Sequence, residues 1–349
     1  MSMRGVNLGG WLLLEKWITP SLFTGLSAED EYSFCLEDAR NGYKRLREHR
    51  ANFITREDFV WLAQHGVNAV RLPVGYWALD DDNPYLNCRQ QLDNAFQWAG
   101  ELGLDILLDL HGAPGSQNGR DHSGKTGPTK WTRSSNRKRT LEVLEQLALR
   151  YGTEPALWGI SLLNEPGWKV SLWTLRRFYG KGYDVVRKHC DERVAIVISD
   201  AFRPRKWNGF MTGPRYTNVV LDMHLYQAFG RRDKTLDPAG HIAKTRNEWS
   251  GLIARSDKPV IIGEWSLGLD PKTFAGMDEK QKHAALRSYA DAQIDVFNHS
   301  AASFFWTYKT EDASDWNLRH LMERDSIVDS FQTGHYAGLK TFHGSSSGP

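Results

Sequence analysis

Gly159-Ile-Ser-Leu-Leu-Asn-Glu165 is a short apolar run that ends in a glutamate, and Pro259-Val-Ile-Ile-Gly-Glu264 is a second one. Runs of this length and composition predict strands that are buried on both faces, as in a parallel sheet. A carboxyl group at the carboxyl end of such a strand lies where α/β barrels keep their active sites. The two runs therefore predict an α/β barrel with Glu165 and Glu264 on its catalytic face.

The rest of the chain supports a barrel, because strand-like and helical patterns alternate along it. The eight strand-like segments are Arg4–Gly10, Asn68–Val74, Asp105–His111, Gly159–Glu165, Ala195–Ala201, Val219–Tyr226, Pro259–Trp265 and Ala302–Tyr308. The helical patterns between them include Arg56–His65, Gln91–Leu102, Arg139–Tyr151, Leu172–His189 and Lys280–Phe297. Eightfold alternation favours a single TIM (β/α)8 barrel over a sandwich.

The length of 349 residues suits one such barrel with long loops on the catalytic face. The loops are Gly10–Thr55, which has room for a short helix of its own, Gly112–Trp131 and Gln227–Asp237. Long connections in compact domains are usually functional or disordered, and we expect a function for these. We predict one catalytic domain over residues 1–343 and a flexible tail over 344–349, either native or left by cloning.

The composition excludes several classes of partner. Lys and Arg number 44 and Asp and Glu 42, so the net charge of +2 gives no reason to expect binding to nucleic acid. No apolar run reaches the length of a membrane span, and the first residues do not resemble a secretory signal. We expect a cytoplasmic protein with reduced thiols at Cys35, Cys88 and Cys190, although a secreted mature form would look the same. The oligomeric state is left open.

Two carboxyl groups at neighbouring strand ends are what the cleavage of a glycosidic bond needs. We expect Glu165 to be the general acid and then the general base, with a pKa raised by burial and by the second carboxylate. We expect Glu264 to be the nucleophile that forms a glycosyl ester. A retaining mechanism places such carboxyl groups roughly 5–5.5 Å apart.

Six more polar or aromatic residues come at or near the predicted strand ends: Arg71, His111, Asn164, His224, Tyr226 and Trp306. Arg71 and Tyr226 can donate hydrogen bonds to Glu264 and keep it ionised. Asn164 can hold the sugar 2-hydroxyl, and the two histidines can bind hydroxyls or orient Glu165. Trp306 can form an apolar floor under the sugar ring.

The histidines also leave a metal site open as an alternative. His111 follows Asp109 and His224 follows Asp222 by two positions, and alternate residues of a strand face the same way. The chain has no His-Glu-x-x-His or Cys-x-x-Cys motif to support a metal. We therefore expect neither a metal nor another cofactor.

Taken together, these residues resemble glycoside hydrolase family 5. The motifs Asn164-Glu165-Pro166 and Gly263-Glu264-Trp265 are similar to the acid/base and nucleophile signatures of the family. The six other residues match its remaining active-site positions. The resemblance implies a retaining TIM-barrel enzyme that acts on carbohydrate.

The similarity extends to one branch, the exo-β-1,3-glucanases known from fungi, over about Arg4 to Trp316. It implies that Glu15 and Asp121 contact the terminal glucose and close the pocket behind it. Phe229 matches one half of an aromatic clamp at the entrance. Two features depart from the branch: Arg120 stands at the other clamp position, and the stretch after Glu264 is shorter.

These observations predict a retaining exo-β-glucosidase that acts on β-1,3-glucan or its oligosaccharides. The departures leave exo against endo action and the leaving group open, so a β-glucosidase for a lipid, sterol or disaccharide conjugate is a second hypothesis. A barrel that binds glycans without cleaving them is a third. A substrate panel separates the first two, and binding without product release would support the third.

Overall fold

The computed structural model describes residues 2–324 of the 349. The predicted tail 344–349 and the last part of the predicted 1–343 domain lie outside the described residues. Cys35, Cys88 and Cys190 are all described, and each is free and buried. None of the helices within residues 2–324 has the length and apolar character needed to cross a membrane.

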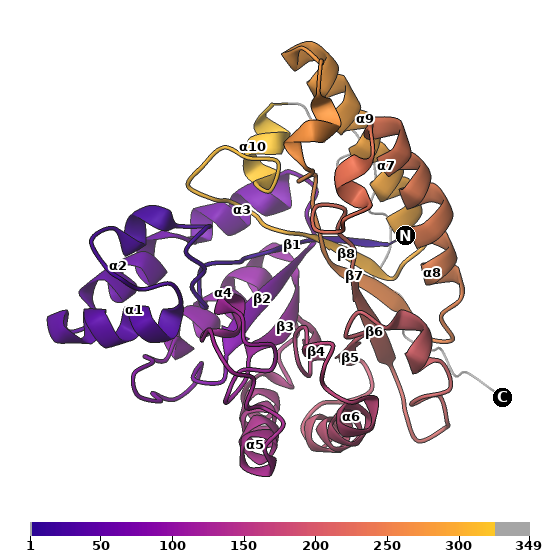
Figure 1. Cartoon of the computed structure of the whole chain (residues 1–349). Helices are drawn as coiled ribbons and strands as arrows, with labels where there is room; N and C mark the ends of the chain where they lie inside the picture. Colours follow the sequence, from indigo (N-terminus) through magenta and orange to yellow (C-terminus); the bar gives the residue numbers. More distant parts are fainter. Residues whose placement is uncertain (1, 325–349) are drawn as a thin grey trace.

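Eight parallel strands close into a barrel in the order of the sequence, with β8 paired to β1 (Figure 1). The strands are β1 Met3–Asn7, β2 Ala69–Gly75, β3 Asp105–Gly112, β4 Leu157–Ser161, β5 Ala195–Ser199, β6 Val219–His224, β7 Val260–Trp265 and β8 Ala302–Phe305. The predicted TIM barrel and its eight strands are therefore confirmed. Most strand residues are buried, because the barrel core covers one face of each strand and the helices cover the other.

The α-helices lie around this barrel (Figure 1). They are α1 Glu31–Asp38, α2 Lys44–Asn52, α3 Arg56–Gln64, α4 Arg89–Leu102, α5 Ser134–Tyr151, α6 Leu172–Arg187, α7 Pro238–Lys244, α8 Ser250–Ala254, α9 Glu279–Phe297 and α10 Leu318–Glu323. All five helices named from the sequence are present, and α5 begins five residues earlier than predicted. A π-helical turn, Thr245–Trp249, joins α7 to α8.

The expected alternation fails at one connection. Between β5 and β6 the structure has only the 3₁₀ turn Pro204–Trp207, and no α-helix. The backbone there takes left-handed conformations at Ala201, Phe202 and Met211, which interrupt a helix. The prediction of a helix after every strand was wrong at this point.

The long loop after β1 forms a small layer of its own. It carries α1 and α2, two helices where room for one was expected, and the fully buried Glu31 on α1 joins them. One Glu31 oxygen accepts from Arg50 of α2 at 2.9 Å and from Trp77 at 3.0 Å, and the other accepts from the backbone N–H of Leu14 at 2.8 Å. This carboxylate therefore fixes the backbone directly before Glu15.

The same loop is bound to the loop after β3. Asp30 accepts two hydrogen bonds from Thr126, one from the backbone N–H and one from the hydroxyl, both at 2.6 Å. The N–H of Tyr32 donates to the carbonyl of Gly124 at 2.9 Å. The ammonium group of Lys125 lies 3.2 Å above the Tyr32 ring. Two segments almost one hundred residues apart thus form one continuous wall.

Candidate active site

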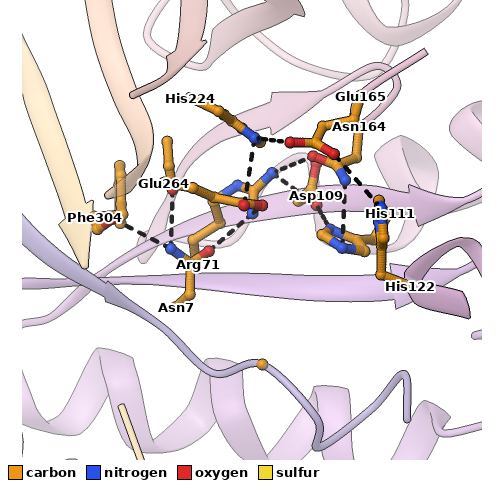
Figure 2. Close-up of polar contacts among 12 residues, drawn as sticks. Asn7, Arg71, Asp109, His111, His122, Asn164, Glu165, His224, Glu264 and Phe304 are labelled. Carbon is orange, nitrogen blue, oxygen red and sulfur yellow. Dashed lines mark hydrogen bonds and ion pairs between the residues drawn. The ribbon is translucent and has the colours of Figure 1, made fainter. Parts of the chain in front are cut away.

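The carboxyl end of the barrel gathers the polar residues that the sequence singled out (Figure 2). Arg71 lies on β2, His111 on β3, and His224 and Glu264 at the ends of β6 and β7. Asn164 and Glu165 lie beyond β4, which ends at Ser161 and not at Glu165 as predicted. The backbone N–H of Asn164 still donates to β3, at the carbonyl of Leu110, and this bond holds the segment over the barrel.

The two glutamates face one another across the mouth. Carboxylate oxygens of Glu165 and Glu264 and a ring nitrogen of His224 all lie within 4.8 Å of one another. Inverting glycosidases need roughly 6.5–9.5 Å between the carboxyl groups, to leave room for a water molecule. The observed spacing agrees with the close pair expected for retention.

Two donors hold Glu264 from either side. Arg71 donates from Nη1 to one carboxylate oxygen at 3.0 Å, and the Tyr226 hydroxyl donates to the other at 2.9 Å. Beside Glu264, Gly263 donates its N–H to Asp222 at 2.8 Å. A Cβ on Gly263 would lie 2.2 Å from that carboxylate, so only glycine fits before Glu264.

Arg71 is the centre of the buried network and is completely shielded from solvent. Besides Glu264, it donates to Asn7 and Asn164, both at 2.8 Å, and its Nη2 lies 3.0 Å from Asp109. Burial lowers the pKa of Arg71, but the charges of Asp109 and Glu264 outweigh this and raise the pKa above its ordinary value. A permanent positive charge thus lies beneath the carboxyl pair.

His111 has a defined tautomer. Its Nδ1 lies 2.7 Å from Asp109, and its Nε2 lies 3.3 Å from the amide nitrogen of Asn164. Because Asp109 accepts and the amide donates, Nδ1 carries the proton and Nε2 is the acceptor. The ring is nearly parallel to that of Trp306, 5.6 Å away.

His224 lies between the two glutamates. Its Nδ1 is 2.7 Å from Glu165 and 3.4 Å from Glu264, and its Nε2 is 3.3 Å from Asp222. Burial lowers the pKa of His224, but the charges of Glu264 and Asp222 and the bonds to Asp222 and Glu165 raise it well above 6.5. His224 is therefore an imidazolium that donates from both nitrogens.

This imidazolium reverses the expected pKa order of the glutamates. Burial raises the pKa of Glu165, but the hydrogen bond and charge of His224 outweigh it, so the pKa is held at about 2. Burial also raises the pKa of Glu264, and there His224 and Arg71 offset only part of the increase. The expectation of a raised pKa at Glu165 was wrong, because the sequence does not show that His224 takes the proton.

Glu15 and Asp121 lie on the wall formed by the β1 and β3 loops. Glu15 is buried and accepts a hydrogen bond from the indole of Trp17 at 2.8 Å. Burial raises the pKa of Glu15 well above 4.5, and the negative charges of Asp121, Glu264 and Glu165 raise it further. These electrostatic interactions place Glu15 and Asp121 at the same site as the two glutamates.

Aromatic side chains form a rim next to this wall. Phe229, with 70% of its surface exposed, packs 5.6 Å from Tyr226 and 6.0 Å from Trp316. Trp316 also lies 5.5 Å from Tyr226 and 5.9 Å from Trp17. Arg120 is exposed at the other predicted clamp position.

Three site residues were not predicted. Asn7 supports Arg71, but an asparagine in the middle of the predicted strand Arg4–Gly10 carries no signal of such a role. His122 lies with Nε2 3.6 Å from Glu165 and could have been noticed because it follows Asp121 (Figure 2). Trp316 joins the rim from a loop with no motif of its own.

The metal alternative depended on two His–Asp pairs. Within residues 2–324, the potential ligand cluster contains His224 with the two glutamates, and it contains neither Asp109 nor Asp222. Asp109 instead pairs with Arg71 and His111. The proposed pairs therefore serve as hydrogen-bond partners for the histidines.

Comparisons with known proteins agree with this geometry. Residues 41–311 match the family model for cellulase (glycosyl hydrolase family 5). The chain is 37% identical over 364 residues to a glucan 1,3-beta-glucosidase of Blumeria graminis, covering 91% of this chain and 85% of that protein. It is also 37% identical over 362 residues to a probable glucan 1,3-beta-glucosidase A of Aspergillus fumigatus, covering 92% and 86%.

Solved structures share the fold at lower identity. The rutinosidase from Aspergillus niger has a TM-score of 0.79 at 20% identity, with 93% of this chain and 98% of that chain covered. The endoglucanase Cel5A from Thermotoga maritima has a TM-score of 0.62 at 14% identity, with 94% and 96% covered. With the family match and the 37% identical relatives, the conclusion is that this chain belongs to glycoside hydrolase family 5, whose members are retaining enzymes that act on carbohydrate.

Proposed function

We propose that this protein is a retaining exo-β-glucosidase that removes terminal glucose from β-1,3-glucan or its oligosaccharides. One observation carries the proposal: two carboxylates lie within 4.8 Å, one held by Arg71 and Tyr226 and the other by a protonated histidine. The names of the 37% identical relatives support the β-1,3 linkage.

In the first step, Glu264 attacks the anomeric carbon and Glu165 protonates the leaving oxygen. The donors Arg71 and Tyr226 keep Glu264 ionised and aimed at the ring. The proton for Glu165 comes from His224 across their 2.7 Å hydrogen bond. This transfer becomes favourable as Glu264 loses its charge to the new ester, because that charge is what holds the proton on His224.

In the second step, Glu165 is ionised again and acts as a base. It takes a proton from a water molecule, which attacks the ester carbon and releases Glu264. Asn164, oriented by Arg71 and His111, is placed to bind the 2-hydroxyl of the sugar. That bond strengthens in the transition state, since charge then develops next to the 2-carbon.

Exo action is supported by the wall that carries Glu15 and Asp121. Their carboxyl groups are suited to bind hydroxyls of a terminal glucose, and we expect the bonded wall to close the pocket behind that glucose. The Trp306 ring, packed on His111, is suited to be the floor of the same pocket.

The first test is hydrolysis of laminarin and short β-1,3-oligosaccharides by the purified full chain, followed by NMR. We expect glucose as the only early product, released as the β-anomer because two inversions restore the configuration. Early α-glucose would contradict retention, and early internal oligosaccharides would contradict exo action.

A second candidate is a β-glucosidase with another leaving group, and the exposed Arg120 at the clamp position favours it. An arginine there offers a charge where the branch has an aromatic ring. Hydrolysis of an aryl β-glucoside, together with no release of glucose from laminarin, would select this second candidate. Glucoside binding without hydrolysis of either substrate would select the non-catalytic barrel.

A further inference from the structure

A cavity of about 280 Å³ opens on the catalytic face beside the aromatic rim. Its walls come from the segment after β7, the start of α9, the loop after β8, and α10. Trp316 is part of this wall and also of the rim, where it lies 5.5 Å from Tyr226. One indole therefore separates the cavity from the catalytic mouth.

Gly268 makes this arrangement possible. A Cβ on Gly268 would lie 2.2 Å from the Trp316 ring, so the indole lies directly against the backbone after β7. The stretch after Glu264 is the one that the sequence showed to be short. The cavity is thus a property of this chain's own β7 and β8 loops.

The charged groups in the cavity are mainly cationic. Lys282 and Arg324 carry permanent charges, and Asp315 is the single carboxyl group among the lining residues. Burial raises the pKa of Asp315, although Lys282 and Arg324 offset part of that increase. Glu279, on the first turn of α9, adds a negative charge near Asp315 but does not line the cavity.

Within residues 2–324, these two cations have few anionic partners. The Lys282 ammonium lies 4.0 Å from Asp315, which is longer than a hydrogen bond. Arg324 donates to Nε2 of His320 at 3.2 Å, a contact that involves no carboxylate. The cavity therefore offers donors and positive charge to a ligand.

We propose that the cavity behind Trp316 extends the leaving-group site and binds an anionic group, a carboxylate or a phosphate monoester, carried by the leaving group. This inference rests on the second candidate of the proposed function, a β-glucosidase with another leaving group, because the leaving group of β-1,3-glucan carries no anion. The aromatic rim binds the portion next to the glucose, and the cavity binds the charged end that passes Trp316.

Matched substrates test the proposal with the full chain. The substrates are alkyl β-glucosides of increasing chain length. Each length is made with a terminal carboxylate, a terminal phosphate or an uncharged terminal carboxamide. We expect the kcat/KM of the charged substrates, relative to the carboxamide, to peak at one chain length. In the double variant Lys282→Gln/Arg324→Gln this preference falls about tenfold at low salt, because kcat/KM falls much further for the charged substrates than for the carboxamide.

The control is Lys280→Gln, which removes an exposed charge from the same helix without touching the cavity. Comparison of the carboxylate-ended and phosphate-ended substrates shows which anion the cavity prefers. An equal preference in the wild type and the double variant would overturn the proposal. An equal loss of this preference in Lys280→Gln would also overturn the proposal, because it would show that the overall positive charge of the surface causes the preference.

Calorimetry gives a readout that does not require turnover. With Glu264→Gln as the background, we expect the carboxylate-ended glucoside to bind more tightly than the carboxamide, and the double variant to abolish the difference. If no glucoside is hydrolysed but this difference is present, the proposed function fails and the anion site stands. If hydrolysis proceeds and the difference is absent, the anion site fails alone.

Discussion

His224 decides where the catalytic proton is held. Its contacts with Glu165, Glu264 and Asp222 join three carboxylates to one imidazolium. The glutamates therefore titrate as parts of one cluster, and the acid step draws on a proton that the histidine holds in the free protein.

The pH profile follows from this cluster. The pKa of His224 is raised well above 6.5, so the cluster keeps its proton in neutral solution and loses it only as the pH rises further. On the acid side, activity falls as Glu264, whose pKa is raised, becomes protonated. We expect a bell-shaped kcat/KM profile whose alkaline limb lies above pH 6.5.

The variant His224→Gln should move the alkaline limb to lower pH. Without the imidazolium, the proton must be held by the carboxyl pair itself, which binds it more weakly than a histidine between carboxylates. Measurement of kcat/KM against pH for both proteins checks this. An alkaline limb that stays in place in His224→Gln would show that another group supplies the proton.

At the scale of single residues, the sequence was informative where a residue closes an apolar run. Arg71, His111, His224 and Glu264 were found in this way. Asn7 was not, because it lies in the middle of the predicted strand Arg4–Gly10, although it ends β1 in the structure. His122 was not, because it lies in a loop. The protonation of His224 could not be predicted from the sequence, because it depends on the distances from its ring nitrogens to Glu165, Glu264 and Asp222.

Among the elements, the layer formed by α1 and α2 depends on one buried carboxylate for its stability. Glu31 is fully buried and accepts hydrogen bonds from Arg50, Trp77 and Leu14. Its loss would leave the guanidinium of Arg50 buried without its partner, which is costly.

We expect Glu31→Gln to lower the free energy of unfolding by about 3 kcal/mol. We also expect a higher KM with a smaller change in kcat, because the backbone before Glu15 loses its anchor. The matched control is Glu29→Gln, whose partner Lys16 is at the surface, and it should leave both properties unchanged. Denaturant unfolding and steady-state kinetics test this, and equal stability of the two variants would contradict it.

Strands and helices were predicted correctly where burial requires a regular pattern of apolar residues. The strands are short apolar runs because both faces are covered, and α3, α4, α6 and α9 follow a helical period. The connection from β5 to β6 differs because Ala201, Phe202 and Met211 take left-handed conformations, which depend on local backbone contacts rather than on periodicity.

For the molecule as a whole, the net charge of +2 predicts little long-range attraction or repulsion. We expect kcat/KM for neutral β-1,3-oligosaccharides to change less than about twofold between low and high salt. The anionic glucosides described above should instead lose their advantage as salt increases. Stopped assays over a salt series check both, and a strong salt effect on the neutral substrates would contradict the charge argument.

The bonded wall between the β1 and β3 loops has a consequence for how the enzyme moves along a polymer. For the proposed exo-glucosidase, the hydrogen bonds that tie Asp30 to Thr126 lead us to expect a glucose pocket that is closed at its far end. A freed glucose must leave through the opening by which the chain entered, and the remaining chain must first withdraw. We therefore expect the proposed enzyme to be distributive and to release the polymer after each cut.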